Sequence, residues 1–327
     1  MSDEASDSFE CFGSICTVHV TGAGPLGRAE EAAAGVRRRL LEWHTRFSRF
    51  LPDSELSRLN GDPQGLVRVS PLMARFAACV RGAASLTDGL VDATLLDAVQ
   101  DAGYAGEIAA PLPLARALAL APERRPAAAG AARWRELEVD VASATVVRPP
   151  GLKLDSGGIA KGLFADVLAA ELAGHARFAV NCAGDLFVGG AEAVSRSVEV
   201  ESPFDAGVMH TFEIEAGGVA TSGIGRRSWL DERGEPAHHL LDPATGRPAF
   251  TGIVQASALA DSALGAEIRA KAALLSGPRG AARWLAQGGV VVFDDGSHQV
   301  FEPPRTIELS ELSGYVQARQ TAAAEHV

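Results

Sequence analysis

The order of the predicted elements is the feature that most restricts the fold of this chain. Six short, mostly apolar segments follow one another between residues 177 and 241, with turn residues and no helical pattern between them. These strands are predicted at residues 177–182, 185–189, 196–201, 209–215, 218–221 and 238–241. The regular alternation of strands and helices that is typical of parallel α/β folds is missing. We therefore predict an α+β fold with a largely antiparallel sheet core and packed helices.

Periodic segments flank this run of strands on both sides. Apolar spacing predicts helices at 26–47, 71–86, 158–173, 262–276 and 278–286, a short helix after Ser54 and one that ends near Gly103. Further strands are predicted at 11–20, 252–259 and 289–293, and a hairpin over 137–147. Residues 105–136 are rich in Ala, Pro and Arg and are expected to form an insertion or lid. We predict a single domain over residues 10–310, with disordered tails at 1–9 and 312–327.

Composition and charge restrict the possible partners. The chain has 327 residues, of which 47% are hydrophobic, and a formal net charge of −11. This hydrophobic content is typical of a globular protein, whereas the acidic balance argues against nonspecific nucleic-acid binding, which depends on Lys and Arg. No segment resembles a secretory signal or reaches the roughly 20 apolar residues of a membrane span. Cys11, Cys16, Cys79 and Cys182 form no Cys-x-x-Cys pair, which favours free thiols. We expect no nucleic-acid partner, no membrane span and a cytoplasmic location.

The segment KLDSGGIAKGLFAD, residues 153–166, joins an apolar strand to a predicted helix through three glycines. It fails the P-loop pattern, because Lys161 precedes Gly162 and Leu163 follows. It also lacks the G-x-G-x-x-G spacing of a dinucleotide fingerprint. A glycine-rich helix start still permits close approach of a ligand and offers free N–H groups to an anion. The residues alone support a ligand loop and a structural turn equally.

Two loops carry side chains that suit chemistry. HHLLDPATGRP, residues 238–248, has good turn residues in Asp242 and Gly246, so it is either a hairpin turn with an incidental histidine or a loop with a histidine general base. GGVATSGIGRRSW, residues 217–229, ends a strand and opens a loop. Its hydroxyl and arginines fit either a phosphate site or a solvated turn.

Two other polar features favour structural interpretations when each is taken alone. Asp185 lies in a Gly-Asp turn between two predicted strands. Glu267 and Lys271 are four residues apart on a predicted helix, which favours a surface ion pair.

Six blocks nevertheless occur in an order that resembles the ApbE family of FAD:protein FMN transferases. The blocks are SRFLPDSELSRLN (48–60), TDGLVDAT (87–94), LDSGGIAKGLFAD (154–166), NCAGD (181–185), ATSG (220–223) and HLLDPATGRP (239–248). The glycine segment and the His-x-x-Asp-Pro-x-Thr-Gly motif are the specific ones. The resemblance runs from about residue 10 to residue 295.

The resemblance implies an enzyme that binds FAD and transfers FMN to a Thr or Ser hydroxyl of a target flavoprotein, with release of AMP. It implies that His239 is the catalytic base for the incoming hydroxyl and that Mg²⁺ bridges the FAD diphosphate. The implied cofactor-binding residues are Asp92, Ala93, Gly157, Gly158, Lys161, Leu163, Ser222, Gly223, Leu240, Asp242 and Thr245. Asp242 and Thr245 would also hold the histidine loop in shape.

The implied metal site departs from the family pattern. The family holds its metal with a backbone carbonyl of the glycine segment, here at Ala160, and with an aspartate and a threonine four apart on a late helix. Those two positions are Glu267 and Lys271 in this chain. Glutamate offers an oxygen ligand, whereas protonated lysine does not. Our hypothesis is that Lys271 contacts the diphosphate directly and that Mg²⁺ binds weakly or not at all. A shifted register would make Asp261 the carboxylate instead.

Two other functions stay open on the same scaffold. One is an FAD pyrophosphatase, which would release FMN and AMP. The other is a non-catalytic FAD-binding protein whose metal site has decayed, which the unusual residues at 267 and 271 keep open.

Overall fold

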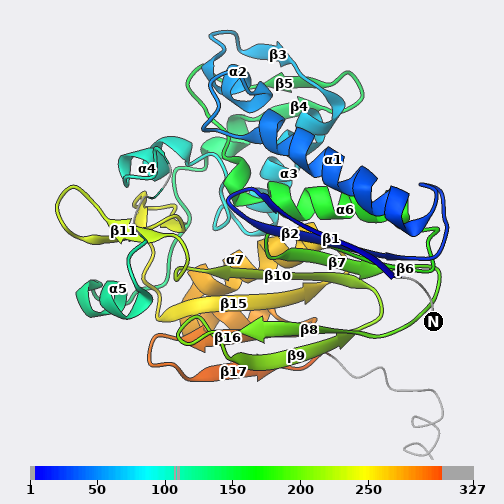
Figure 1. Ribbon diagram of the computed structural model, residues 1–327. Helices are drawn as coiled ribbons and strands as arrows, with labels where there is room; N and C mark the ends of the chain where they lie inside the picture. Colours follow the sequence, from blue (N-terminus) through cyan, green and yellow to red (C-terminus); the bar gives the residue numbers. More distant parts are fainter. Residues whose placement is uncertain (1–3, 107, 109–110, 304–327) are drawn as a thin grey trace, which may run out of the picture.

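The computed structural model describes residues 4–106, 108 and 111–303. Its centre is an eight-stranded sheet in the order β1-β2-β6-β7-β10-β15-β16-β17 (Figure 1). These strands span, in that order, Glu4–Cys11, Ser14–Thr21, Arg177–Cys182, Asp185–Gly189, Gly217–Gly223, Ile253–Ala260, Gly289–Phe293 and His298–Phe301. Every neighbouring pair in the sheet is antiparallel. The predicted α+β class with a largely antiparallel sheet is confirmed.

Three long helices pack against the sheet, namely α1 (Ala29–Phe47), α6 (Ala160–Leu172) and α7 (Ala263–Gly280) (Figure 1). The apolar face of α1 meets α6 through aromatic rings. Phe164 of α6 lies with its ring centroid 5.1 Å from that of Trp43 and 5.0 Å from that of Phe47. All three side chains are buried, so the two helices and the sheet share one hydrophobic core.

A smaller layer lies beyond α1 and α6, at the top of Figure 1. It contains α2 (Glu55–Gly61), α3 (Pro71–Leu86) and a three-stranded sheet in the order β3-β5-β4. Those strands span Leu66–Arg68, Thr145–Val147 and Glu138–Asp140. Helix α3 covers the predicted range, because Ser70 caps its first turn by accepting a hydrogen bond from Met73 N at 3.3 Å and proline occupies its first position.

Strands β8 (Arg196–Glu201) and β9 (Val208–Ile214) pair only with each other. The sequence predicts both strands but not this separation from the main sheet. The β8–β9 ribbon buries Val200 and Phe212 against Val219 of β10 and Val290 of β16. It therefore covers part of the main sheet with a small core of its own.

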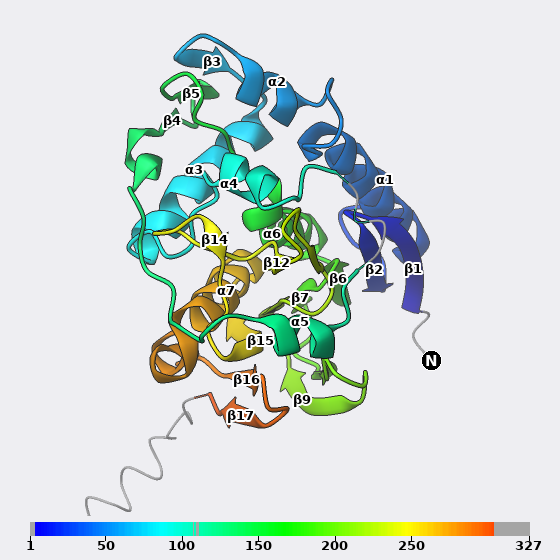
Figure 2. The same cartoon turned by 90° about the vertical axis from the view of Figure 1, so that its left-hand side faces the viewer.

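The remaining short elements gather on the side of the molecule that faces the viewer in Figure 2. They are α4 (Leu96–Asp101), α5 (Leu114–Leu120), β11 (Ser228–Leu230), β12 (Pro236–His238), β13 (Leu241–Asp242) and β14 (Arg247–Pro248). Helix α5 and an extended stretch make up much of the predicted insertion at 105–136. This stretch is bonded to the body, since Arg125 N donates to Phe250 O at 3.0 Å and Ala127 N to Leu275 O at 2.8 Å.

Three expectations from the sequence need correction. A disordered tail over residues 1–9 is wrong for residues 4–9, which belong to β1; acidic residues hide an alternation that buries Phe9 and Cys11. The strand predicted at 238–241 is divided between β12 and β13. The helix predicted at 278–286 is interrupted, because α7 breaks at Gly277 (φ 68°), ends at Gly280 and is followed by a 3-10 turn at Ala281–Trp284.

The tail predicted for residues 312–327 lies outside the described residues. The limits of a single domain at 10–310 and the lid role of residues 105–136 stay predictions. None of the helices in the described ranges has both the length and the apolar character needed to cross a bilayer.

Candidate functional site

A cavity of about 880 Å³ lies between the glycine segment, α7 and the loops that carry Arg227 and His239. A volume of this order suits a nucleotide-sized ligand. Among the predicted site residues, the cavity is lined by Asp92, Ala93, Gly157, Gly158, Ala160, Lys161, His239, Leu240 and Lys271. Segments from very different parts of the sequence thus meet at one concave surface.

The glycine segment is anchored before it enters the cavity wall. Asn60 of α2 holds Leu154 on both sides, since Nδ2 donates to Leu154 O at 2.9 Å and Leu154 N donates to Oδ1 at 2.8 Å. Asp155 Oδ1 then accepts a hydrogen bond from Gly157 N at 3.1 Å. These bonds fix the backbone of the segment, of which Asp155 and Gly157 line the cavity.

Two of the glycines are required by close packing. A Cβ at Gly158 would lie 2.8 Å from the Cβ of Ala93, so this glycine lets the segment contact the loop at 92–94. A Cβ at Gly162 would lie 2.6 Å from Leu264 Cα, so this glycine lets α6 contact the start of α7. The glycines therefore pack the segment as a tight turn that also forms part of the cavity wall, and its role as a ligand loop stays a prediction.

Asp166 joins the same two helices. Its carboxylate accepts hydrogen bonds from Ala263 N at 2.7 Å and from Leu264 N at 3.1 Å, which are free donors in the first turn of α7. The end of the glycine motif thereby sets the position of α7. This contact decides which α7 side chains face the glycine segment.

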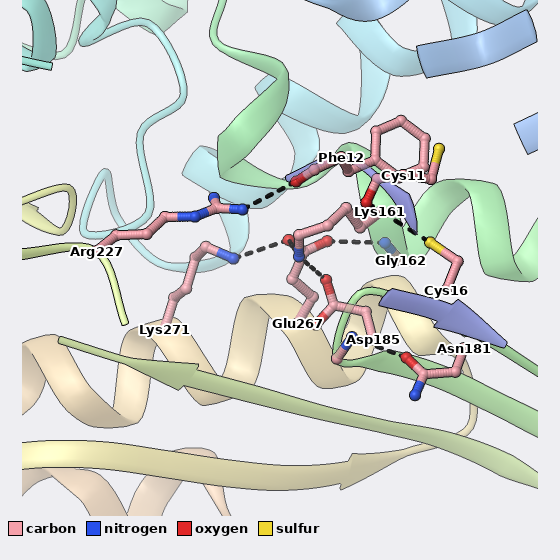
Figure 3. A network of polar contacts seen from close by, with 11 residues as sticks. Cys11, Phe12, Cys16, Lys161, Gly162, Asn181, Asp185, Arg227, Glu267 and Lys271 are labelled. Atoms are coloured by element: carbon pink, nitrogen blue, oxygen red, sulfur yellow. Dashed lines mark hydrogen bonds and ion pairs between the residues drawn. The ribbon is translucent and has the colours of Figure 1, made fainter. Parts of the chain in front are cut away.

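Those α7 side chains are Glu267 and Lys271, which join a network of buried charges with Lys161 and Asp185 (Figure 3). Lys161 Nζ forms an ion pair with Asp185 and lies 3.3 Å from Glu267 Oε1. Lys271 Nζ lies 2.8 Å from the same Oε1 atom. Glu267 Oε2 accepts a hydrogen bond from Gly162 N at 2.9 Å. The surface ion pair favoured by the spacing of residues 267 and 271 is therefore wrong, because both side chains are buried.

The pKa values follow from burial and from these partners. Burial raises the pKa of Glu267, but Lys161 and Lys271 outweigh it and lower the pKa to about 2. Burial also raises the pKa of Asp185, and the Glu267 carboxylate adds to it, so this pKa reaches about 7 despite Lys161. For Lys161, the two carboxylates outweigh burial and raise the pKa. Glu267 and Lys161 are thus held in their charged forms at neutral pH.

His239 lies on the cavity wall with an imidazole held neutral. Burial, followed by the nearby charges of Arg227, His238 and Lys271, lowers the pKa of His239 well below its usual value of 6.5. Its Nδ1 atom is buried and has no hydrogen-bond partner among the described residues. A neutral imidazole with an unused nitrogen can accept a proton from a ligand.

Asp242 shapes the loop that carries His239. Its Oδ2 accepts a hydrogen bond from Thr245 Oγ1 at 3.1 Å, and its Oδ1 accepts from Ala244 N at 3.1 Å. Oδ1 also accepts from Ala128 N at 2.9 Å, which lies in the segment at 105–136. The histidine loop and the predicted insertion are therefore tied to each other by one carboxylate.

The structure does not bring every predicted cofactor residue to the cavity. Leu163, Ser222, Gly223, Asp242 and Thr245 are absent from its described lining. Leu163 and Ser222 are buried. Ser222 lies on β10 opposite Ala256 of β15. Their role in binding a cofactor stays a prediction.

Sequence reasoning missed Arg49 at this cavity and the role of Asp185, whereas it offered the arginines of the loop at 217–229 as candidates for a phosphate site. Arg49 has a nearly buried side chain (6% exposed), which lies 3.6 Å from Asp155 and donates to Tyr104 O at 2.7 Å. Arg227 donates to Phe12 O at 3.0 Å and points toward the ion network (Figure 3). Asp185 looked like a turn residue because its partner is 24 positions away, at Lys161. The signal that could have found it is its place in the ordered blocks.

The donor set does not fit the divalent metal that the resemblance implies. Magnesium requires several oxygen ligands, yet both oxygens of Glu267 already accept hydrogen bonds and an ammonium occupies position 271. Among the described residues, no cluster of three or more His, Cys, Asp or Glu side chains could hold a metal ion. Asp261, the alternative carboxylate, is exposed and faces Gln287 instead of the glycine segment.

Comparison with known proteins places the site in a wider context. A model of the ApbE family matches residues 12–293. A FAD:protein FMN transferase of Rhodobacter capsulatus is 29% identical over 314 residues, which are 92% of this chain and 57% of that protein. The protein of the same name in Escherichia coli (strain K12) is 29% identical over 150 residues, 44% of this chain and 42% of that protein. The chain thus spans 57% and 42% of the curated relatives' lengths.

Solved structures show the same fold. The ApbE protein of Thermotoga maritima superposes with a TM-score of 0.74 at 20% identity, over 92% of this chain and 97% of that one. The flavinyl transferase ApbE of Pseudomonas stutzeri superposes with a TM-score of 0.70 at 21% identity, over 91% of this chain and 95% of that one.

Proposed function

Because the chain belongs to the ApbE family, we propose that it is a flavin transferase, which moves FMN from FAD to a Thr or Ser hydroxyl of a target flavoprotein and releases AMP. The FAD diphosphate would lie against the glycine segment, where the N–H groups of a helix start favour an anion. Lys271 and Arg227 would approach it from α7 and from the loop after β10.

In the proposed reaction, the hydroxyl oxygen of the target attacks the phosphorus of the FMN half of FAD. A new P–O bond forms, the bond from this phosphorus to the bridging oxygen breaks, and AMP leaves with that oxygen. His239 accepts the hydroxyl proton, because its lowered pKa keeps the imidazole neutral near pH 7. Phosphoryl transfer depends mainly on positioning and charge stabilisation, which the buried cations provide.

One observation carries this proposal. A neutral histidine, His239, lines the same cavity as the cationic side chains of Lys161, Lys271 and Arg227. The histidine alone would suit many reactions, and the cations alone would suit simple binding of an anion. Their joint presence on the cavity wall, together with Gly157 and Gly158, favours transfer at a phosphorus atom.

The test is to incubate the protein with FAD and a flavoprotein domain that carries a candidate acceptor threonine. We expect in-gel flavin fluorescence on the target and an equal amount of AMP. Replacing the acceptor threonine with alanine should remove the fluorescence. His239→Asn should lower the transfer rate by about 10² to 10⁴, the usual contribution of a general base, and leave FAD binding intact. His19→Asn, a change on β2 away from the cavity, serves as the control.

Other outcomes separate the alternatives. AMP and free FMN without a labelled target would indicate an FAD pyrophosphatase, in which water replaces the hydroxyl. Bound FAD without either product would indicate a non-catalytic binding protein. Each of these results would replace the proposed transferase.

A further inference from the structure

The hydrogen bonds of Glu267 leave this carboxylate no free oxygen for a metal. Oε1 accepts from Lys271 at 2.8 Å and from Lys161 at 3.3 Å, and Oε2 accepts from Gly162 N at 2.9 Å. The side chain of Glu267 is fully buried, so water does not compete for its hydrogen bonds. A cation in this place would have to displace an ammonium group from the carboxylate.

The second carboxylate of the network is also engaged. Asp185 pairs with Lys161 and is buried at the floor of the network (Figure 3). The two lysines therefore face one fully charged carboxylate, Glu267, and one, Asp185, whose pKa of about 7 leaves it only partly charged near neutral pH. Arg227 adds a positive charge beside them, and its guanidinium donates a hydrogen bond to the carbonyl of Phe12. The region next to the glycine segment is thus positive without any metal.

Lys271 is the member of the network that both lines the cavity and has a single carboxylate partner in the described part of the chain. Lys161 also lines the cavity and is 14% exposed, but it is shared between Asp185 and Glu267. The Lys271 side chain lies on the same wall and is 9% exposed, whereas Glu267 is fully buried. An ammonium group has three N–H donors, and in the described part of the chain only Glu267 forms an ion pair with Lys271. The remaining donors are available to an anion in the cavity.

We propose that the Lys271 ammonium is a built-in cation that binds the diphosphate of FAD directly, so that FAD binding requires no divalent metal. The proposal rests on the proposed function in one respect, namely that the ligand carries a diphosphate. Glu267 holds Lys271 in place, and Lys161 links both to Asp185. The site thereby supplies with a fixed side chain the positive charge that a bound metal would supply.

The first test measures binding and not catalysis. The Kd values of FAD and of inorganic pyrophosphate are measured by calorimetry in excess EDTA and in saturating Mg²⁺. For the wild type, we expect each Kd to be the same in both buffers within about twofold, which is small beside the tenfold that 1.4 kcal/mol represents. Direct titration with Mn²⁺, followed by its EPR signal, should detect no bound ion in the protein without FAD.

Variants at position 271 test whether Lys271 is responsible for metal-independent binding of FAD and pyrophosphate. Lys271→Met keeps the length of the side chain and leaves Glu267 paired with Lys161 and Gly162; it should weaken both ligands by about tenfold to a hundredfold, the range of a charge-assisted hydrogen bond. Lys271→Thr introduces an oxygen ligand, so its FAD binding should become stronger in Mg²⁺ than in EDTA. Lys153→Met is the matched control, because Lys153 pairs with Asp97 outside the cavity lining. Circular dichroism verifies that each variant is folded.

Each result decides the matter. A wild type that loses FAD in EDTA, or a Lys271→Met variant that binds like the wild type, would overturn the proposal. If the wild type binds neither FAD nor pyrophosphate in either buffer, this inference and the proposed transferase both fail. If it binds both ligands in EDTA but labels no target, only the proposed transferase fails.

Discussion

Lys271 Nζ lies 2.8 Å from Glu267 Oε1, one turn further along α7, and both side chains are buried against the glycine segment. The same spacing on an exposed helix would contribute only a few tenths of a kcal/mol. Here the pair is desolvated and shared with Lys161, so the loss of one member leaves a buried charge uncompensated. This difference in burial is the basis of the first prediction.

Glu267→Gln should destabilise the protein by about 3 kcal/mol, because Lys271 and Lys161 lose a buried negative partner. The measurement is the free energy of unfolding in urea. Glu123→Gln is the control, since Glu123 pairs with Arg125 at the surface and both side chains are 76% exposed. The control should match the wild type. Equal losses in the two variants would show that burial of the network carries no special weight.

Gly162→Ala and Gly82→Ala should change stability in opposite directions. A Cβ at Gly162 would lie 2.6 Å from the backbone of Leu264, so α6 and α7 must separate, at a cost of about 2 kcal/mol. Gly82 is an exposed residue inside α3 with no atom within 4 Å of the added Cβ, so alanine should stabilise the protein by up to about 1 kcal/mol. Thermal unfolding compares the two. A Gly162→Ala variant as stable as the wild type would contradict the close packing of the two helices.

His238→Asn should flatten the dependence of stability on acidic pH. Burial lowers the pKa of His238 to about 3 from 6.5, so the unfolded chain binds a proton that the folded chain excludes. The stabilising effect of the neutral ring is therefore complete above pH 6.5 and declines as the pH falls toward 3. At pH 5 the loss amounts to about 2 kcal/mol.

Asparagine can keep the acceptor that Leu240 N uses at 3.3 Å while it removes the titrating ring. His239 also has a lowered pKa, so part of the dependence should persist. Urea unfolding between pH 7 and pH 5 tests this, with the exposed His298→Asn as control. A profile in which His238→Asn and wild type run parallel would argue against a neutral, buried His238.

Asp242→Ala should loosen the segment at 105–136 as well as the histidine loop, because one carboxylate oxygen bonds both Ala128 N and Ala244 N. We expect faster tryptic cleavage after Arg124, because the following Arg125–Pro126 bond resists trypsin, and a higher KM for FAD. Asp231→Ala is the control: Asp231 bonds Arg233 N and Glu235 N, which lie in its own turn. If both variants were cleaved at the wild-type rate, Asp242 would not be the link between the two segments.

Local patterns predicted the regular elements well. The ranges of α3, β6 and β7 agree with the sequence prediction, because their apolar spacing and their turn residues lie within the elements themselves. Strand β1 was not predicted in full because its inward residues alternate with acidic and hydroxyl side chains. An edge strand of this kind can be recognised only from its pairing with β2. The separation of β8 and β9 from the main sheet was also not predicted, because it too depends on which strands pair with each other.

The candidate site divides along the same line. The sequence by itself determined the family resemblance, the α+β class and the unusual residues at positions 267 and 271. Only the tertiary structure decided that Lys161 and Asp185 join Glu267 and Lys271 in one buried network, and that Gly162 packs against α7. The physical reason is that the strength and role of a charge depend on its burial and on its partners. Both are set by segments more than 100 residues apart, such as Gly162 and Glu267, whose separation is 105.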